Sequence, residues 1–178
     1  MTTPFDPERV LSQPLMAYLA TIGPNGPRNA PVWFHWEDGT LSMLGSSDSS
    51  SIRRIEADPR CAVEIVDYDN AAGRLLHLGL RGTATITAMD TALFKRLLRK
   101  YLDADEANWN PWFIDNVARI EDPEGRLIRL KPDSIFTNNV SFFRTGPDLA
   151  TLRKRVCLSQ RAFYNCAIKK RIWPALLC

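Results

Sequence analysis

The sequence is poor in side chains that bind metal ions, because its 178 residues include only four cysteines and two histidines. The cysteines are too far apart to form CxxC pairs, and His35 and His77 do not have an HxxxH spacing. Protein-ligated zinc sites depend on such closely spaced pairs of ligands. We therefore predict that the protein holds no metal ion.

Long hydrophobic runs are absent as well. No apolar run approaches the about 18 residues that a membrane-spanning helix needs. The first residues, MTTPFDPERV, lack the basic and then apolar pattern of a signal peptide. The 45% hydrophobic and 24% charged residues are ordinary for a soluble globular protein and argue against the disordered and fibrous classes. We expect a cytoplasmic protein with no membrane partner, of a length that suits one domain.

Acidic residues are absent from the C-terminal end. Residues 151–178 contain seven lysines and arginines and no Asp or Glu, which leaves 16 basic against 20 acidic residues, a net charge of −4, in residues 1–150. The sequence predicts a domain over 1–150 and an atypical basic tail over 151–178. The tail fits three interpretations: an end without function, an extension that packs in a dimer, or an anion-binding arm. Because the body is acidic, we expect no nucleic-acid partner.

Three strands are predicted in the N-terminal third of the chain. The segments 15–22 and 28–36 are joined by the turn formers GPNGP, which is typical of a β-hairpin. Alternation in the second segment places Phe34 on one face of a strand and His35 on the other. The turn EDGT then leads to a third strand at 41–44.

Two longer strands are expected next, over 61–68 and 74–87, because both segments alternate and are rich in β-branched residues. Gly79 and Gly82 lie inside the second of them. Glycine within a strand often marks a bulge or a bend, as the corners of a barrel require. We therefore predict a distortion of this strand near the two glycines.

The hydrophobic period changes from Asp90, which is placed to cap an amphipathic helix. This helix is expected to turn four cations toward solvent: Lys95, Arg96, Arg99 and Lys100. A short helical turn is expected in 109–116, and a last strand or strand pair in 126–139. Because strands come first, the helix comes late and no βαβ alternation occurs, the predicted fold class is mainly β. The predicted architecture is a small antiparallel barrel with accessory helices.

The stretch GSSDSSSIRR, residues 45–54, has two interpretations. Serine-rich runs are often flexible linkers. Hydroxyl groups, exposed amides and the start of a helix can instead form an anion site. Ser51 is expected to cap a short helix that follows it. Under the second interpretation, the anion-binding residues are Ser46, Ser47, Ser49, Ser51, Arg53 and Arg54.

The ordered segments LATIGPNGPRNAPVWFHWEDGTLSML, IRRIEADPRCAVEIVD and LRGTATIT, with the polar loop between the first two, resemble the FMN-binding split-barrel family. Its best-known class is pyridoxamine 5'-phosphate oxidase, and the resemblance covers roughly residues 10–145. It implies an antiparallel split β-barrel and a homodimer with FMN at the subunit interface. The isoalloxazine ring is expected along the backbone of four residues, and the phosphate at the polar loop. The four residues are Ala30, Pro31, Val32 and Trp33.

The resemblance has one departure in the phosphate loop. The position where the family commonly has a phosphate-binding lysine falls on Ser51. Arg53 or Arg54 is expected to take over this role, since arginine binds phosphate through two parallel hydrogen bonds. Trp112 is expected to cover the ring from the partner subunit, with core or dimer packing as the alternative. Because other branches of the family bind coenzyme F420 or haem, both stay open as alternative cofactors.

The resemblance implies an FMN-dependent oxidoreductase that acts on an unidentified small molecule, with the redox chemistry supplied by the cofactor. The alternative is a protein of the same fold that carries a flavin, F420 or haem without turnover. No catalytic acid or base is apparent, since a lone strand histidine such as His35 is more often a packing residue. The substrate-phosphate residues of true pyridoxamine phosphate oxidases are not recognisable, so oxidation of vitamin B6 is not expected.

Overall fold

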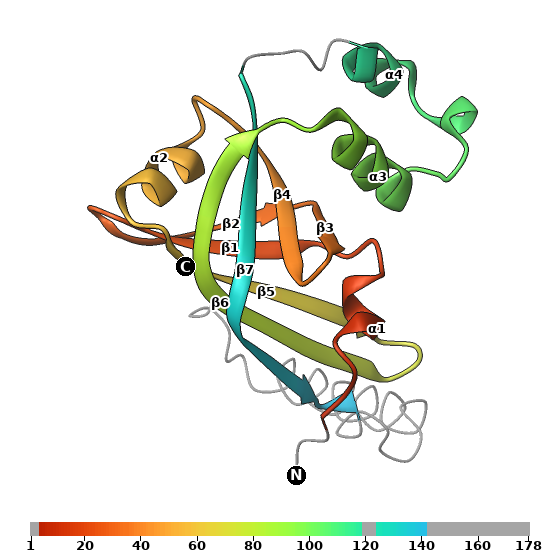
Figure 1. Cartoon of the computed structure of the whole chain (residues 1–178). Helices are drawn as coiled ribbons and strands as arrows, with labels where there is room; N and C mark the ends of the chain where they lie inside the picture. Colours follow the sequence, from red (N-terminus) through yellow and green to blue (C-terminus); the bar gives the residue numbers. More distant parts are fainter. Residues whose placement is uncertain (1–3, 119–123, 142–178) are drawn as a thin grey trace, which may run out of the picture. The chain divides into compact units, whose positions relative to one another are not determined.

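Seven strands of the described chain form one antiparallel sheet in the order β2–β1–β5–β6–β7–β4–β3 (Figure 1). The computed structural model describes residues 4–118 and 124–141. The strands are β1 (Ala17–Gly23), β2 (Gly26–Val32), β3 (Phe34–Glu37), β4 (Thr40–Ser46), β5 (Arg60–Asp69), β6 (Arg74–Ala88) and β7 (Gly125–Asn139). The predicted mainly β, antiparallel class is therefore confirmed. The predicted domain boundary at residue 150 and the basic tail lie outside the described residues.

The two edge strands of this sheet are neighbours in the chain. β2 ends at Val32 and β3 begins at Phe34, so Trp33 alone separates them. Because β2 pairs with β1 and β3 pairs with β4, at opposite ends of the strand order, the sheet must curl until its edges meet at Trp33. Within residues 4–118 and 124–141 no ladder joins β2 to β3. The sheet is therefore a split barrel.

The prediction of one continuous strand over 28–36 is wrong, because the chain changes its pairing partner at Trp33. The N–H of Phe34 donates a hydrogen bond to the Tyr101 hydroxyl at 3.1 Å. The ring of Trp33 stacks on the ring of Tyr101, with 4.7 Å between the centroids. Alternation along a segment indicates extended backbone but does not say which strand it pairs with. A residue far along the chain decides where this strand divides.

In the order of the sequence, one helix precedes the first strand and the other helices come between strands. They are α1 (Glu8–Leu11), α2 (Ser50–Ala57), α3 (Thr91–Tyr101), the 3-10 turn η1 (Glu106–Asn108) and α4 (Pro111–Ala118). α2 packs against β1, β4 and β6, whereas α3 packs against β3 and α4. The short helical turn predicted in 109–116 is confirmed, because α4 begins within this segment at Pro111. None of the helices in the described residues is long and apolar enough to cross a membrane.

The start of α2 differs from the prediction. Ser49, and not Ser51, is the N-terminal cap, since its extended backbone lets the side chain accept a hydrogen bond from the N–H of Ile52 at 3.3 Å. Any of several serines could have capped this helix. Ile52 and Ile55 of this helix lie in the core, where they are 1% and 2% exposed. The cap predicted for α3 is confirmed, because the Asp90 carboxylate accepts a backbone N–H at 3.0 Å.

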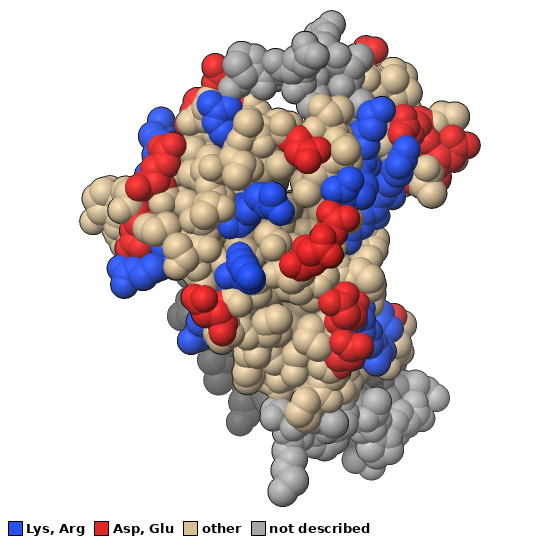
Figure 2. All heavy atoms as spheres, in the orientation of Figure 1, with Lys and Arg blue, Asp and Glu red and all other residues tan. Residues whose placement is uncertain are grey.

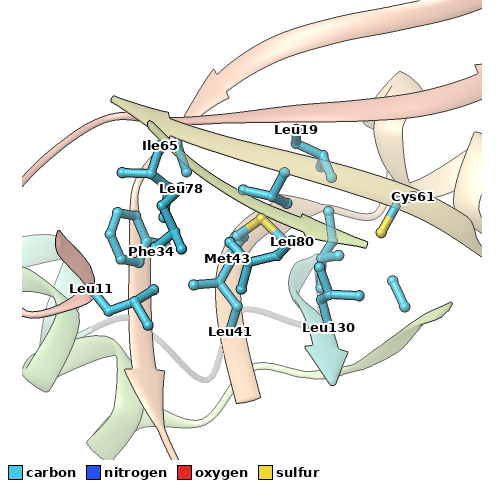
Figure 3. Packing of buried hydrophobic residues seen from close by; sticks show 14 of the residues in the cluster. Leu11, Leu19, Phe34, Leu41, Met43, Cys61, Ile65, Leu78, Leu80 and Leu130 are labelled. Carbon is cyan, nitrogen blue, oxygen red and sulfur yellow. The ribbon is translucent and has the colours of Figure 1, made fainter. Parts of the chain in front are cut away.

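The core fills the space that the curled sheet encloses. Figure 3 shows buried side chains from strands and from α1 converging on one cluster. Among its members are Leu11, Leu19, Phe34, Leu41, Met43, Ile65, Leu78, Leu80 and Leu130. Alternate residues of β1 and β5 point into this cluster, so both strands show the period of two that the sequence displays.

A bulge interrupts the pairing of β6 with β7 between Arg81 and Gly82, which confirms the predicted distortion. A Cβ atom on Gly82 would lie 2.9 Å from the carbonyl oxygen of Lys131 and 3.1 Å from the backbone nitrogen of Asp133. The backbone of β7 therefore approaches this position too closely for any side chain. Gly79 lies in a regular part of the ladder, where a Cβ would be 3.9 Å from Phe136.

We expect Gly82→Ala to lower the free energy of unfolding by about 1–3 kcal/mol, because the new methyl group must displace the backbone of β7. The matched variant Gly79→Ala adds the same methyl group to the same strand at an ordinary contact distance. It should change the free energy of unfolding by less than about 1 kcal/mol. Urea titrations of both variants measure the difference, and equal effects would contradict the close approach at Gly82.

Candidate functional site

The serine-rich loop between β4 and α2 is held by its own side chains and by Glu124. The Ser46 hydroxyl donates to Oδ1 of Asp48 at 2.6 Å, and the Ser47 hydroxyl donates to the carboxylate of Glu124. The backbone N–H of Ser47 also donates to the carbonyl oxygen of Glu124 at 2.8 Å. These bonds give the loop a defined course into α2, which argues against a flexible linker. They also commit the hydroxyl protons of Ser46 and Ser47 to carboxylates, so these two predicted side chains do not donate to an anion in this arrangement.

Two arginines of α2 face the turn between β1 and β2. There a cavity of about 480 Å³ is lined by Ile22, Gly23, Pro24, Ser50, Arg53, Arg54, Ala57 and Asp58. Nη1 of Arg54 donates to the Ser50 hydroxyl at 3.1 Å. A Cβ on Gly23 would lie 3.0 Å from Cδ and Nε of Arg54, so the glycine leaves room for this side chain to lie across the turn. Two guanidinium groups and a hydroxyl form the donor set that a phosphate requires.

The split of the barrel is flanked by two of the predicted segments. β3 pairs with β4 as far as Met43, after which Leu44 to Ser46 pair with β7 on one side. On their other side these three residues have no strand partner in the described part of the chain. Before Trp33 the chain runs as β2, whose residues Ala30 to Val32 pair with β1 and not with β4. The backbone of β2 and the start of the serine loop therefore lie on the two sides of the split.

β2 links the arginine cavity to the split. Its seven residues begin at the turn that lines the cavity and end at Val32, next to Trp33. At about 3.3 Å per residue the strand spans roughly 20 Å. The site is therefore elongated, with cations at one end and an aromatic cluster at the other.

The aromatic cluster at Trp33 joins the barrel to α3 and α4. The Trp33 ring stacks on Tyr101 and, with 6.0 Å between centroids, on Phe113. Trp112 meets Phe113 edge to face at 4.9 Å and is 63% exposed. Trp109 is buried. Because the Trp33 ring is packed against residues of two helices, only the main chain of Trp33 is available to a ligand. The ring of Trp112 is accessible.

The cations of α3 divide into two kinds. Arg96 pairs with Glu37 at 2.9 Å and Arg99 pairs with Glu106 at 2.7 Å, near the surface where Figure 2 shows basic and acidic groups side by side. The prediction that Lys100 faces solvent is wrong. Its Nζ lies 3.4 Å from the centroid of the Phe34 ring and donates to the carbonyl oxygen of Leu11 at 2.8 Å, and burial lowers its pKa to about 7.

His35 lies on β3 beside these cations. Burial lowers its pKa, and the positive charges of Arg96 and Lys100 act in the same direction, whereas Glu37 opposes them. Nδ1 of His35 is buried without a hydrogen-bond partner in the described residues. This environment favours the neutral imidazole, which is typical of a packed histidine. No group of three or more His, Cys, Asp or Glu side chains in the described residues is placed to hold a metal ion.

We expect the stability of the protein to rise with pH from about 7 to 9 because of Lys100. Its pKa of about 7 lies below its ordinary 10.5, so the unfolded chain binds more protons in this interval. The slope is at most about 1.4 kcal/mol per pH unit, and less in practice because the ammonium group keeps part of its contact with water. Burial raises the pKa of Cys61 to about 11 and that of Tyr101 to about 12, so both groups oppose this rise above pH 9.

Urea denaturation at pH 7, 8 and 9 measures this slope. In the variant Lys100→Met the group that titrates is gone, and the free energy of unfolding should be nearly constant over the same interval. The variant Arg99→Met, on the exposed side of α3, should keep the slope of the unchanged protein. A slope that persists in Lys100→Met would contradict the assignment.

The predicted cofactor residues fall in four places. Arg53 and Arg54 line the cavity at the β1–β2 turn. The backbone of 30–33 and the pair Ser46 and Ser47 flank the split, while Trp112 is exposed on α4. The other two predicted serines begin α2. Ser50 was not among the predicted residues but lines the cavity. Its spacing of four residues from Arg54 on a helix is the signal that could have identified it.

Comparisons with known proteins support the same fold. The family described as pyridoxamine 5'-phosphate oxidase matches residues 8–139, which span every element from α1 to β7. A solved structure named F420 reductase is 25% identical with a TM-score of 0.57, and the match covers 75% of this chain and 98% of that one. No curated protein matches the chain.

Two further structures have lower identity and show the fold alone. A conserved hypothetical protein from Mycobacterium tuberculosis is 17% identical with a TM-score of 0.65, and the match covers 83% of this chain and 93% of that one. An FAD-binding protein from Mesorhizobium loti is 14% identical with a TM-score of 0.51, covering 74% and 88%. The split barrel is thus shared by proteins whose names point to different flavin-type cofactors.

Proposed function

The chain belongs to the pyridoxamine 5'-phosphate oxidase family, and from this premise we propose that the protein binds FMN and acts as an oxidoreductase on a small molecule. The observation that carries the proposal is the course of β2, which runs from the arginine cavity to the split beside Trp33. A phosphate at one end and a flat ring at the other match a site of this shape. The cavity volume of about 480 Å³ is ordinary for a small-molecule site.

Each part of the site has a separate task. Arg53 and Arg54 hold the phosphate through charge-assisted hydrogen bonds. The main chain of β2 at the split holds the ring, and the exposed Trp112 limits the access of water to it. FMN, once bound, supplies the transfer of a hydride or of single electrons. The residues of this chain therefore position the cofactor and leave the redox step to it.

Coenzyme F420 is the second candidate, because the 25% identical structure is named an F420 reductase. F420 also carries a phosphate and a flat ring, so the same arginines and strand suit it. A haem carrier of the same fold, the other alternative, would also need an axial ligand for the iron, and no histidine, cysteine or methionine lines the arginine cavity. The lining therefore favours a phosphorylated flavin-type cofactor.

The test is a set of absorption and fluorescence titrations with FMN, riboflavin and F420. We expect FMN to bind and riboflavin, which has the same ring without the phosphate, to bind at least tenfold more weakly. Tighter binding of F420 than of FMN would make F420 the cofactor. If none of the three binds, the proposal is wrong. Assays of the loaded protein with NADH and NADPH separate a reductase from a carrier without turnover.

We also propose that the protein is a homodimer that pairs through the outer face of β1, β5, β6 and β7 at the level of Tyr18 and Phe136. The residues Tyr18, Glu64, Gly79 and Phe136 are aligned across these strands. Tyr18 is 42% and Phe136 is 62% exposed, and exposed aromatic residues of this kind mark interaction surfaces. Light scattering after size exclusion should show a dimer, and Phe136→Asp should shift it to the monomer. A monomeric unchanged protein would contradict this proposal.

A further inference from the structure

A second cavity lies on the outer face of β1, β5 and β6, with a volume of about 530 Å³. Ala20 and Arg81 are two residues along their strands from Tyr18 and Gly79, so the cavity opens beside the proposed dimer surface. Its lining includes Ala20, Ile22, Arg60, Ala62, Arg81 and Asp133, and none of the predicted cofactor residues. Ile22 lines both this cavity and the arginine cavity of α2, so the two sites adjoin.

The sheet register creates the hollow beside Arg81. Ala20 is opposite Ala62 on β5, and Ala62 is opposite Arg81 on β6, so these residues are neighbours at one level of the sheet. Adjacent strands are about 4.8 Å apart, and an alanine side chain is a single methyl group. Two alanines in succession therefore leave an apolar depression next to the one long cationic side chain of this row.

The positive charge in this cavity belongs mainly to Arg81. Arg60 donates to both carboxylate oxygens of Asp58, at 2.9 and 2.6 Å, so its charge is largely compensated. Arg81 is exposed and forms no ion pair within the described residues. Asp133 also lines the cavity and opposes the binding of an anion. Arg81 is thus the one guanidinium group of this cavity that has no ion pair in the described residues, and Ala20, Ile22 and Ala62 form an apolar wall beside it.

The bulge places Arg81 at this position. Arg81 is opposite Ser134 and Gly82 is opposite Pro132, so Asp133 is the extra residue on β7. Gly82 permits the close approach of the two backbones that the bulge requires. Bulges of this kind redirect the neighbouring side chains and occur often next to functional sites. The bulge therefore brings both charged groups, Arg81 and Asp133, to the rim of one cavity.

We propose that this cavity binds the substrate, an organic anion whose carboxylate or phosphate is held by Arg81. Its apolar body packs against Ala20, Ile22 and Ala62, and its anionic group forms charge-assisted hydrogen bonds with the guanidinium group. The name substrate rests on the proposed function, because the adjoining cavity is the one assigned to the cofactor phosphate. The anion site itself rests on the cavity and Arg81 alone.

The probes are benzoate and phenyl phosphate, with inorganic phosphate as the anion that lacks an apolar body. Titrations followed by ¹H–¹⁵N NMR should show saturable shifts of the Ala62 and Arg81 amides with both aromatic anions. Arg81→Gln should raise the dissociation constants at least tenfold, and Asp133→Asn should lower them severalfold. Arg129→Gln, an exposed strand arginine that lines neither cavity, should leave them unchanged. Absence of saturation, or equal constants in Arg81→Gln and Arg129→Gln, would overturn the proposal.

Cofactor binding is measured on the same variants so that the two proposals fail separately. Arg81→Gln should retain FMN binding, and a double substitution of Arg53 and Arg54 should retain benzoate binding. Benzoate bound by a protein that ignores FMN would support the anion site and overturn the flavin assignment. FMN bound by a protein that ignores all three anions would support the flavin assignment and overturn the anion site.

Discussion

The double variant Arg53→Ala, Arg54→Ala is expected to bind FMN at least 100-fold more weakly than the unchanged protein. Both guanidinium groups line the cavity at the β1–β2 turn, where the cofactor phosphate is proposed to bind. A hydrogen bond to a charged group contributes about 1.5–3 kcal/mol, so the loss of two at the lower value corresponds to about 100-fold in affinity. Quenching of FMN fluorescence measures the dissociation constants.

The control for this result is Arg129→Gln, which removes one exposed cation without touching either cavity and should leave FMN affinity unchanged. Riboflavin provides a second control, since its weak binding should not respond to the double substitution. Urea denaturation checks that the double variant is folded; the exposed bond from Arg54 to Ser50 contributes little to stability. An unchanged affinity in a folded double variant would show that the phosphate binds elsewhere.

Phe34→Ala is expected to lower the free energy of unfolding by about 3–5 kcal/mol, the range for a phenylalanine removed from a packed core. Phe34 is 0% exposed, directly after the residue at which the barrel divides. Its ring meets Tyr101 edge to face at 6.4 Å and lies under Nζ of Lys100. The truncation therefore leaves a cavity and also removes the aromatic partner of a buried cation.

Phe34→Leu is the graded control, because it keeps most of the side-chain volume and should cost less than half as much. Urea titrations at one pH give all three free energies of unfolding. At pH 9, where most Lys100 side chains are expected to be neutral, the difference between Phe34→Ala and the unchanged protein should shrink toward the cavity contribution alone. Equal stabilities of Phe34→Ala and the unchanged protein would contradict the core position of this ring.

The strands could be predicted because their evidence is local. In β1 and β5 each inward residue is separated from the next by one outward residue, and a period of two is visible without knowledge of the partner strand. The cap of α3 at Asp90 and the bulge at Gly82 were predicted for the same reason, since a carboxylate side chain and a missing Cβ carry their own conformational preferences.

The division at Trp33 and the burial of Lys100 were not predicted, because each depends on a distant residue. The start of α2 was misplaced by two residues within a run of serines that can all act as caps. Tyr101 accepts the N–H of Phe34, which is 67 positions away in the chain. Lys100 donates to Leu11, which is 89 positions away. Helical periodicity assigns Lys100 to a polar face, but it does not show that α1 and β3 cover that face.

The candidate site shows the same contrast between local and distant evidence. Apart from the division at Trp33, the sequence by itself determined the strands, the chemical character of the serine loop and the presence of Arg53 and Arg54 next to a helix start. The tertiary structure decided which cavity these arginines line and which serine joins them, and it brought Arg81 beside two alanines of other strands. The physical reason is that backbone periods and caps are set within a few residues. A cavity is set by which strands become neighbours, and this is decided only when the sheet curls and buries its core.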